Sequence, residues 1–381
     1  MPPNPFVYGE IVPAAAFADR ELEFDRLARD LAAGQKVFLI SPRRYGKSSL
    51  IRQVMRHLAR KRVLTLELTV ASSSSYVGFL EAYAAALLGL GTPASGIRQW
   101  AATLMGDLRP ELRFDSASGA AGFSVAFPAV RTARDAARLA SRVFDLPGRI
   151  AATRRRKLAI ALDEFQEVAS FDGGSVEQAL RAAVQTQRDV GYVFAGSEPS
   201  LMERMVSPKR PFYKAGPVMR LERIPEGPFA TFLESRFVAG GIKPEPGLGA
   251  AIVDLAGNIP YDVQRLAHEV WDHVQRERRK TATLDDLHAT LTRLLGEQHV
   301  MFEEAWQRLT LPQRAVLRAA VIEDGRELLS ADVRARHRLS SASGVQSALL
   351  ALQREDILMK ERATYSVTDS LFREWIARKT F

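Results

Sequence analysis

The first 240 residues alternate between short runs of apolar residues and longer stretches in which apolar residues recur with helical spacing. The run VFLI at 37–40 precedes a loop and then a helical pattern, and a second apolar run lies at 63–70. A strand, a helix and a strand in this order predict a βαβ unit, and therefore a mostly parallel sheet covered by helices. Three further buried strands are expected at 158–162, 192–195 and 218–221, with helices at 176–188 and 199–205. The sequence thus predicts a three-layer α/β domain.

A less regular segment at 91–150 interrupts this alternation. It holds the stretches PASG and DSASGAAG, then FSVAF and an Ala- and Arg-rich helical pattern, ARDAARLASRVF. We interpret the segment as an insertion in the α/β domain that contains a small hairpin. Its sequence points to no role.

The composition changes after residue 240, where two glycines and two prolines follow within seven residues. A helical stretch then runs to about 304, and its apolar residues at 263, 266, 267, 270, 271 and 274 form one broad face. The remaining residues predict three helices, at 311–322, 331–336 and 344–354, followed by two strands around a turn. This is a winged-helix pattern. The expected domains are therefore an α/β domain at 1–240, a helical domain at 241–304 and a winged-helix domain at 305–381.

Composition narrows the classes of protein that remain. The 381 residues include no cysteine, which excludes disulfide scaffolds, zinc–thiolate sites, iron–sulfur clusters and thiol nucleophiles. No apolar run approaches the ~18 residues of a membrane span, and the start, MPPNPFVYGE, does not resemble a secretion signal, so we expect a cytoplasmic protein. Lys and Arg number 53 against 44 Asp and Glu, a net charge of +9. This surplus favours an anionic partner such as a nucleic acid, a nucleotide or a membrane surface.

The loop SPRRYGKS at 41–48 resembles the phosphate-binding pattern G-x-x-x-x-G-K-[ST], with a serine in place of the first glycine. Such a loop wraps a phosphate chain with main-chain N–H groups, and its lysine supplies a cation for the β- and γ-phosphates. The serine after the lysine ligates magnesium, and the N-terminus of the following helix adds its dipole. The expected nucleotide-binding residues of this loop are Ser41, Pro42, Arg43, Arg44, Tyr45, Gly46, Lys47, Ser48 and Ser49.

Two acidic residues follow the strand expected at 158–162. Asp163 and Glu164 stand directly after five apolar residues, where an aspartate can hold magnesium while a glutamate orients and deprotonates an attacking water. We therefore expect Ser48 and Asp163 at the metal ion, and Glu164 and Lys47 as catalytic residues. The alternative is that the two acids only cap the next helix.

The strand GYVFAG ends just before Ser197, where a polar side chain can sense the γ-phosphate. Capping of the helix PSLMERM, which begins with Pro199, explains a serine at this position equally well. Both interpretations of Ser197 stay open on the sequence.

Four segments together resemble the archaeal-type ATPases of the STAND branch of AAA+ P-loop NTPases. They are FADRELEFDRL, VFLISPRRYGKSSLI, LAIALDEFQEV and AGNIPYDVQRL, and the terminal YSVTDSLFREWI also matches the usual ending of the family. The resemblance covers nearly the whole chain, and PRRYGKS and the strand-DEFQ element are its most specific parts. It implies a P-loop NTPase core, a helical lid and a C-terminal winged helix, with ATP rather than GTP as the nucleotide and Mg²⁺ as the metal ion.

The resemblance also implies roles for residues outside the phosphate loop. Arg20 and Glu21 would lie near the adenine or the domain junction, and Gly257 and Pro260 would form the turn by which the lid contacts the nucleotide. An ordinary connection between helices, with proline in the first helical turn, explains Pro260 nearly as well.

The chain departs from the family pattern where a Gly-Arg pair usually follows an aromatic residue, since it has FYKA at 212–215. Lys214, Arg220 and Arg223 are therefore alternatives for an arginine finger. Arg265 is a candidate lid arginine by its position alone.

The stretch HEVWDH at 268–273 imitates the zinc motif H-E-x-x-H. Its two histidines are five residues apart, however, which places them about 140° apart around a helix rather than on one face. We interpret His268 and His273 as ordinary surface or junction histidines.

The winged-helix region has a small basic surplus, 13 Lys and Arg against 11 Asp and Glu from Val300 onward. Its third helix leaves Gln346, Ser347, Gln353 and Arg354 on the outside, and arginines at 334, 336 and 338 could meet phosphates. Contacts with double-stranded DNA, with a protein or a second copy of the chain, and occlusion of the nucleotide site all remain open for this domain.

These patterns favour a Mg²⁺- and ATP-dependent switch or hydrolase whose winged helix provides the output. The alternatives are a DNA-binding regulator in which the nucleotide is structural, and a protein-binding scaffold.

Overall fold

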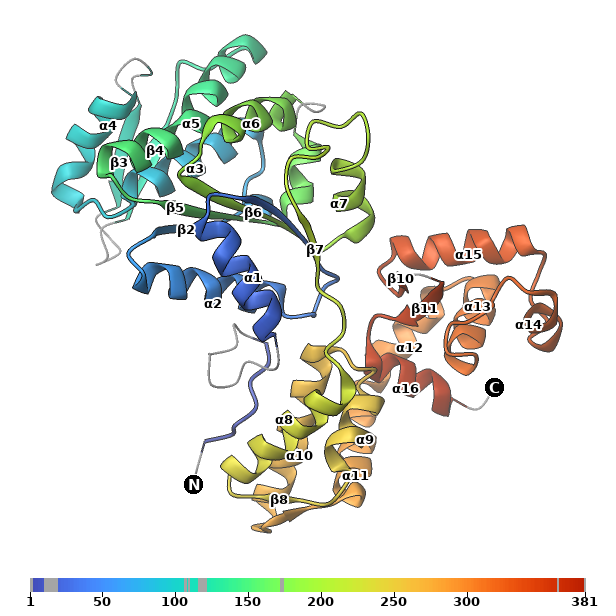
Figure 1. Cartoon of the computed structure of the whole chain (residues 1–381). Coiled ribbons are helices and arrows are strands. Elements are labelled where there is room, and N and C mark those ends of the chain that lie inside the picture. Colours follow the sequence, from blue (N-terminus) through green and yellow to red (C-terminus); the bar gives the residue numbers. More distant parts are fainter. Residues whose placement is uncertain are drawn as a thin grey trace. The chain divides into compact units, whose positions relative to one another are not determined.

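The structure of the chain, a computed structural model, describes residues 3–9, 20–105, 108, 110–115, 122–171, 175–361 and 363–379 (Figure 1). The chain divides into two compact units. One is Ile11–Glu222, here called the α/β unit, and the other joins Met1–Glu10 to Arg223–Phe381 and is called the helical unit.

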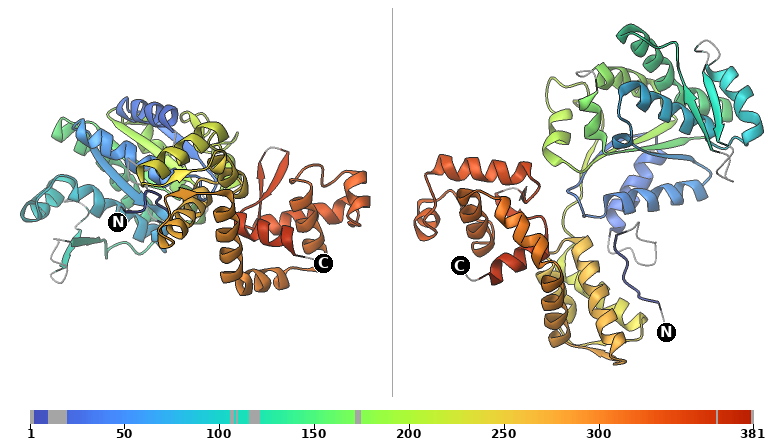
Figure 2. Two further views of the ribbon diagram at one scale, coloured as in Figure 1. Left: turned by 90° about the horizontal axis from the view of Figure 1, so that it is seen from below. Right: turned by 180° about the vertical axis from the view of Figure 1, so that it is seen from behind.

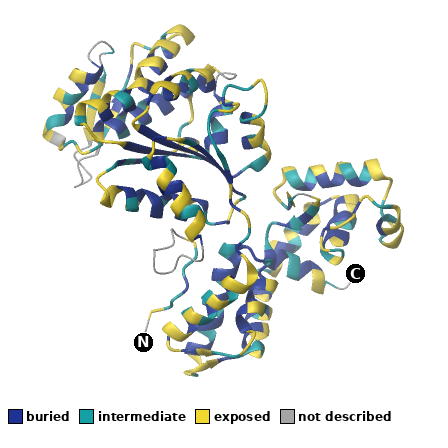
Figure 3. Cartoon of the chain, in the orientation of Figure 1, coloured by how far each residue is buried: buried dark blue, intermediate teal, exposed yellow. Residues whose placement is uncertain are grey.

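A five-stranded sheet forms the centre of the α/β unit. In spatial order its strands are β2 (Leu64–Thr69), β5 (Leu158–Asp163), β6 (Val190–Gly196), β1 (Lys36–Ile40) and β7 (Val218–Arg220). All neighbouring strands are parallel. The central strands β5 and β6 are buried almost throughout, as the dark blue of the sheet shows in Figure 3. Each strand overlaps an apolar segment from which a strand was expected, so the predicted three-layer α/β fold is confirmed.

Helices cover both faces of this sheet (Figures 1 and 2). One face packs against α1 (Glu21–Ala32) and α2 (Lys47–Arg60), and the other against α3 (Tyr76–Gly89), α5 (Ala133–Arg154) and α6 (Ser175–Thr186). Successive side chains of a strand point to opposite faces. Accordingly, Val37 and Leu39 belong to the core with α1 and α2, while Phe38 and Ile40 belong to the core on the other side.

The insertion expected at 91–150 joins the second of these cores. It comprises η3 (Ala94–Gly96), α4 (Ile97–Met105), the antiparallel hairpin β3 (Glu111–Asp115) and β4 (Gly122–Ala126), and most of α5. Buried residues of α4 and of the hairpin, among them Leu104 and Val125, pack with those of α3. The expected hairpin is therefore present, although most of the DSASGAAG stretch lies outside the described residues.

Three short elements complete the α/β unit: η2 (Val70–Ser72), η5 (Phe165–Ser170) and α7 (Pro199–Met205). The unit ends at Glu222, before the boundary expected at 240. The difference lies in α8 (Glu226–Ala239), which packs against α9 (Leu248–Leu255). Their approach is so close that a Cβ atom on Gly249 would lie 2.6 Å from the carbonyl oxygen of Ala230. α8 is therefore part of the helical unit.

The remaining helices of this region are α10 (Pro260–Arg276) and α11 (Leu284–Glu297), and the short strands β8 (Lys243–Pro244) and β9 (Thr281–Ala282) pair in parallel. The apolar face expected on α10 is buried along its whole length. Residues 3–9 lie along α8 and α10, where the ring of Phe6 is 4.7 Å from that of Phe237 and Asn4 donates a hydrogen bond of 2.8 Å to Asp272.

The last part of the chain has the predicted winged-helix order. It contains α12 (His299–Arg308), α13 (Leu311–Ile322), α14 (Ala331–Arg336), α15 (Ala342–Arg354), the antiparallel strands β10 (Leu358–Glu361) and β11 (Thr364–Val367), and α16 (Ser370–Arg378). Rings of Phe302, Trp306, Phe372 and Trp375 pack together between α12 and α16. Among the residues that the structure describes, none of the helices has the length and hydropathy to cross a membrane.

Candidate active site at the end of β1

The loop between β1 and α2 begins the candidate site. Gly46 is the N-cap of α2 and has φ +84°, in the left-handed region that glycine adopts without strain. A Cβ atom at this position would meet no protein atom within 4 Å, so the backbone conformation alone requires a glycine. Ser41, in contrast, is absent from the described residues with positive φ. The chain therefore accommodates serine in place of the first glycine of the motif.

The residues of this loop differ in how far their side chains are exposed to solvent. Ser41, Tyr45 and Ser49 are buried, Pro42 and Gly46 are half-buried, and Arg43, Arg44 and Ser48 are exposed. The main-chain N–H of Ser41 donates to the carbonyl of Gly196 at 3.2 Å, which attaches the loop to the end of β6. Ser41 and Tyr45 therefore lie in the interior of the loop, and the main-chain N–H of Ser41 is already used by the fold.

Lys47, the first residue of α2, contacts both acids that follow β5. Its side chain is 6% exposed, and its ammonium group pairs with Asp163 and, at 3.0 Å, with Oε1 of Glu164. The hydroxyl of Ser48 donates to Oδ2 of Asp163 at 3.0 Å. Because the carboxyl ends of β1 and β5 meet at one edge of a parallel sheet, four predicted residues from two distant segments are brought together.

Glu164 is held by more than Lys47. Its Oε2 accepts hydrogen bonds from Ser197 at 2.6 Å and from the side-chain amide of Gln166 at 2.7 Å. Burial acts to raise the pKa of Glu164, but these hydrogen bonds and the charge of Lys47 outweigh it, so the pKa lies below its ordinary value. The carboxylate is therefore kept ionised and fixed in orientation, so that it can accept a hydrogen bond from a water molecule and orient it.

The structure bears on one of the interpretations that the sequence left open, helix capping. The N-cap of α7 is Glu198, which makes no side-chain capping bond, and Ser197 instead contacts Glu164. Glu164 is the N-cap of η5, also without a side-chain capping bond, and its φ of +52° aims it back at the loop. Helix capping therefore explains neither Ser197 nor Glu164.

Gln166 belongs to this site and was missed from the sequence. It is 3% exposed and lies on η5, and a Cβ atom at Gly196 would come within 2.6 Å of its Oε1. It stands in the DEFQ segment, whose specificity was noted although only the two acids received a role. The sequence offered one sign of this contact, since the amide of Gln166 stands two residues after the acidic Glu164, at the start of a tight turn.

Arg20 is buried, with 5% of its surface exposed. It donates to the carbonyl oxygens of Tyr45 at 3.3 Å and Glu222 at 2.7 Å, and it pairs with Glu23. Arg20 thus links the phosphate loop to the end of the α/β unit, and its predicted contact with the nucleotide stays a prediction.

Gly257 and Pro260 belong to the helical unit. Gly257 and Asn258 both have positive φ, the carbonyl of Gly257 accepts from Arg223 at 2.7 Å, and Pro260 opens α10. The turn is therefore well defined within its unit, and its predicted role toward the nucleotide also stays a prediction.

The alternatives for an arginine finger have partners within their own units. Arg220 pairs with Glu203 at 3.0 Å, and Arg223 pairs with Glu361 at 3.2 Å. Lys214 lies over the ring of Tyr213. Arg265 is half-buried on α10. None of these contacts identifies a finger.

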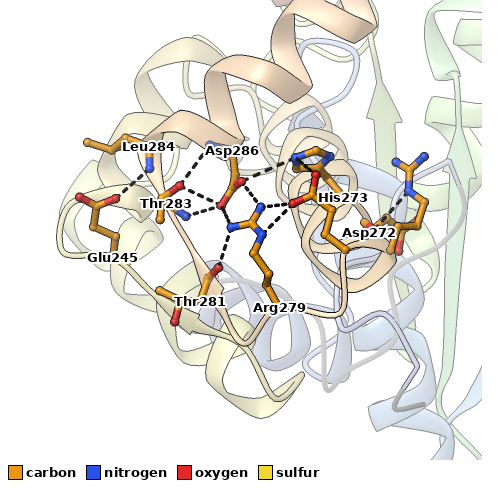
Figure 4. Close-up of polar contacts among 10 residues, drawn as sticks. Glu245, Asp272, His273, Arg279, Thr281, Thr283, Leu284 and Asp286 are labelled. Carbon is orange, nitrogen blue, oxygen red and sulfur yellow. Dashed lines mark hydrogen bonds and ion pairs between the residues drawn. The ribbon is translucent and has the colours of Figure 1, made fainter.

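His273 lies in a cluster that has the ligand spacing of a metal site. Atoms of His273, Glu277 and Asp286 lie within 4.8 Å of one another. The guanidinium of Arg279 pairs with both carboxylates, and Asp286 also accepts from the main chain and hydroxyl of Thr283 (Figure 4). The guanidinium group of Arg279 thus already supplies the positive charge that a metal ion would bring to these carboxylates. His268 meanwhile contacts the carbonyl of Phe6 at 2.8 Å, so neither histidine forms a zinc motif.

In the winged-helix region, the arginines expected to meet phosphates are partly used by the fold. Arg334 donates to the carbonyl of Leu329 at 3.2 Å, and Arg336 pairs with Glu323, which also contacts His337 at 2.7 Å. Arg338 is exposed. The outer face of α15 includes Leu350, 45% of which is exposed. The face is therefore less basic than a dedicated DNA reader requires.

Magnesium and a nucleoside triphosphate suit the residues of the candidate active site. A carboxylate and a hydroxyl oxygen 3.0 Å apart are ligands of the kind that Mg²⁺ prefers. The N-terminus of α2 and the ammonium group of Lys47 lie beside them, where phosphates would be attracted. The donor set fits both groups.

Comparison with known proteins agrees with this architecture. A family model described as a probable winged helix domain matches residues 300–378. No curated protein matches the chain. Among solved structures, the Walker-type ATPase PABY2304 of Pyrococcus abyssi has a TM-score of 0.61 at 16% identity, covering 97% of this chain and 99% of that one.

Two proteins of Aeropyrum pernix are similar as well. ORC2, in a structure of its ADPNP–ADP complexes, has a TM-score of 0.56 at 13% identity, with coverage of 99% and 97%. ORC1 in complex with DNA has a TM-score of 0.51 at 15% identity, with coverage of 96% and 95%. At such identities the likeness establishes the fold. The chain has the fold of AAA+ P-loop ATPases, with a C-terminal winged-helix domain.

Proposed function

We propose that the chain binds ATP with Mg²⁺ and hydrolyses it, and that it acts as a nucleotide-dependent switch with the winged helix as output domain. The observation that supports this most is the meeting of Lys47, Ser48, Asp163, Glu164 and Ser197 at one edge of the sheet. The likeness to a Walker-type ATPase and to a protein studied with ADPNP and ADP agrees with it.

Each residue has a defined task in this proposal. Main-chain N–H groups of residues 43–48 bind phosphate oxygens, and the ammonium group of Lys47 neutralises the β- and γ-phosphates. Ser48 and Asp163 hold the metal ion, which supplies charge neutralisation at the phosphates when bound. Glu164 orients a water molecule and accepts its proton, while Ser197 and Gln166 keep its carboxylate in place. The proposal also includes contacts of the nucleotide with Arg20 and Pro260, and these rest on the resemblance to the ATPase family.

Calorimetric titration with ATP, ADP and GTP, with and without Mg²⁺, tests the binding step. We expect ATP and ADP to bind more tightly than GTP, and Mg²⁺ to strengthen ATP binding. Lys47→Ala should abolish binding up to millimolar ATP, and Lys61→Ala, on the exposed end of the same helix, should not. If the wild-type chain retained no ATP at millimolar concentration, the proposal would be wrong and a protein-binding scaffold would remain.

The switch requires that the nucleotide state alter an output. Light scattering with ATP, with ADP and without nucleotide measures whether assembly changes. An ATPase that hydrolyses ATP while its assembly and partner binding stay the same in all three states would not be a switch.

A DNA-binding regulator is the second candidate function, favoured by the winged-helix match at 300–378. It predicts an affinity for duplex DNA that falls steeply with salt and weakens when Arg334, Arg336 and Arg338 are replaced by glutamine. Because Arg334 and Arg336 have partners inside the domain, Arg338→Gln alone should account for most of the loss. An unchanged affinity in these variants would remove the winged helix as the DNA contact.

A further inference from the structure

The basic surplus of the chain is concentrated on and around α5. Residues 131–157 contain nine Lys or Arg and two Asp, a net charge of +7, whereas the whole chain has a net charge of +9. This segment belongs neither to the candidate active site nor to the winged helix. Its charge therefore calls for a separate explanation.

Four of the five basic residues at the C-terminal end of the segment donate hydrogen bonds to other parts of the fold. They donate to main-chain carbonyl oxygens of neighbouring segments: Arg149 to Leu104, Arg154 to Gly91, Arg156 to Arg62 and Lys157 to Ala32, at distances from 2.5 to 3.0 Å. These bonds attach the end of α5 to α4 and to the loops around it. The fold thus accounts for this half of the charge.

The N-terminal half of the segment holds four more arginines. Arg131, Arg134, Arg138 and Arg142 are all exposed. Within the described part of the chain, the guanidinium groups of Arg131, Arg134 and Arg138 form no hydrogen bond and no ion pair. The nearby acid, Asp135, is engaged as the capping-box partner of Thr132.

These arginines form one row. Positions 134, 138 and 142 are four residues apart and share one side of the helix, and Arg131 precedes its first turn. The opposite side of α5, including Leu139 and Val143, is buried in the core of the α/β unit. Because the core fixes the helix, the three arginines within it, which span about 12 Å along its axis, are presented on a rigid support.

The row weakens the helix on which it lies. Like charges four residues apart destabilise a helix, and positive charges near its N-terminus oppose the helix dipole. Positions at which local preferences conflict with the fold are typical of functional sites. A polyanion bound along this face would remove both repulsions.

We propose that the face of α5 formed by Arg131, Arg134, Arg138 and Arg142 binds the phosphate backbone of double-stranded DNA, without reading its base sequence. Guanidinium groups donate paired hydrogen bonds to phosphate oxygens, and phosphate contacts fix position without specifying sequence. The contact is separate from the winged helix and does not depend on the proposed ATPase activity.

Other polyanions fit the face less well. The exposed residues between the arginines are Thr132, Ala133, Ala137 and Ser141, which offer no large apolar side chain for insertion into a lipid surface. Binding of single strands relies on exposed aromatic side chains on which bases stack, and the one aromatic residue of α5, Phe144, is fully buried. A charged face without apolar or aromatic contacts matches the outside of a duplex.

The test compares the full-length wild-type chain with the triple variant Arg131→Gln, Arg134→Gln, Arg138→Gln. A matched control, Arg56→Gln, Arg60→Gln, Lys61→Gln, removes the same charge from exposed positions at the end of α2, on the other face of the sheet. Binding of a fluorescent 20-base-pair DNA duplex is followed by anisotropy from 50 to 200 mM salt, and circular dichroism checks that each variant is folded.

We expect the α5 variant to bind at least tenfold more weakly than wild type at 50 mM salt. The slope of log affinity against log salt should become shallower by about 2–3, since each lost phosphate contact removes about 0.9. The affinity of the control variant for the duplex should stay within twofold of wild type. The Arg→Lys variant at the same three positions of α5 should keep most of the affinity, and Lys47→Ala should bind DNA like wild type.

Three results would overturn the proposal. The first is that the wild-type chain does not bind the duplex at 50 mM salt, and the second is that the α5 variant and the control lose equal affinity for it. The third is that the α5 variant binds the duplex like wild type but binds vesicles of anionic phospholipid, or a single DNA strand of the same length, more weakly. The last result would assign the face to a lipid surface or to single-stranded DNA instead.

Discussion

The hydroxyl of Ser197 donates a hydrogen bond of 2.6 Å to Oε2 of Glu164. The two residues stand 33 positions apart, at the ends of the adjacent strands β5 and β6. Lys47 holds the other carboxylate oxygen, so the orientation of Glu164 is fixed from two sides. In the proposed function Ser197 only positions the base, whereas Lys47 also binds phosphate, so replacements of these two residues should have different kinetic effects.

Glu164→Gln should bind ATP with an affinity close to that of wild type and lose at least 10²-fold in turnover. Glutamine keeps the shape of the side chain and one of its two acceptor oxygens. It cannot accept the proton from water, and a positioned general base contributes about 10²–10⁴-fold. Calorimetry and a phosphate-release assay on the same sample measure both quantities. Turnover equal to that of wild type would show that Glu164 is not the base.

Ser197→Ala should lower turnover about tenfold or more and leave ATP affinity within about threefold of wild type. The reason is that one hydrogen bond to a charged group, about 1.5–3 kcal/mol, no longer fixes the carboxylate. Gln166→Leu should have an effect of the same kind. Ser170→Ala, which removes a hydroxyl bonded only to the carbonyl of Glu167, is the matched control and should not change turnover. A loss of ATP binding in Ser197→Ala would instead indicate a phosphate contact.

The apolar pattern was sufficient to predict the sheet because each central strand is buried on both faces and therefore appears as an uninterrupted apolar run. The same rule fails for α3. Its sequence, YVGFLEAYAAALLG, is apolar on nearly all sides, so no helical period is visible, and it is buried between the sheet and the insertion. The boundary at 240 was inferred from glycines and prolines, whereas tertiary packing assigns α8 to the helical unit.

The candidate site could be predicted as far as local motifs reach. Lys47, Ser48, Asp163 and Glu164 stand in short segments whose chemistry follows from residue type and from the strand before them. Ser197 remained ambiguous, because its role depends on which strand lies beside β5. Gln166 was missed, because only the turn of η5 brings its amide to the carboxylate of Glu164.

Gly191→Ala should destabilise the α/β unit. The glycine lies in β6 under the end of α1, where an added Cβ would be 2.2 Å from the carbonyl oxygen of Leu31, an atom of the main chain that cannot move aside cheaply. Overpacking of this kind costs about 1–3 kcal/mol, which corresponds to a fall in Tm of roughly 3–10 °C. Differential scanning calorimetry measures it.

Gly227→Ala is the control for this change. Gly227 is exposed in the first turn of α8, and an added Cβ would meet no atom within 4 Å. Alanine should change stability there by no more than about 1 kcal/mol, because its higher helix propensity is opposed by the restriction that Pro228 places on the residue before it. If both variants melted like wild type, the close packing of α1 on β6 would be wrong.

Asp286→Ala should destabilise the helical unit by about 2 kcal/mol at pH 7. Asp286 is buried, pairs with Arg279 and caps α11 through Thr283. The value lies between those of exposed and buried ion pairs, because the side chain of Arg279 is 38% exposed. Urea unfolding followed by tryptophan fluorescence reports mainly on this unit, because it holds Trp271, Trp306 and Trp375, three of the four tryptophans of the chain. Asp285→Ala, exposed one residue earlier, should change stability by no more than about 0.5 kcal/mol.

The difference between wild type and Asp286→Ala should depend on pH. Burial acts to raise the pKa of Asp286, but the hydrogen bonds from Arg279 and Thr283 lower it more, so the pKa in the folded chain lies below its ordinary value of 3.8. A carboxylate with a depressed pKa contributes its stability fully above the pKa of the unfolded chain and loses it as pH falls through the folded value. The stability difference should therefore be constant from pH 7 to about 5 and shrink below about 4. A difference that stayed the same at pH 3 would mean that the charge of Asp286 contributes nothing and that only its packing matters.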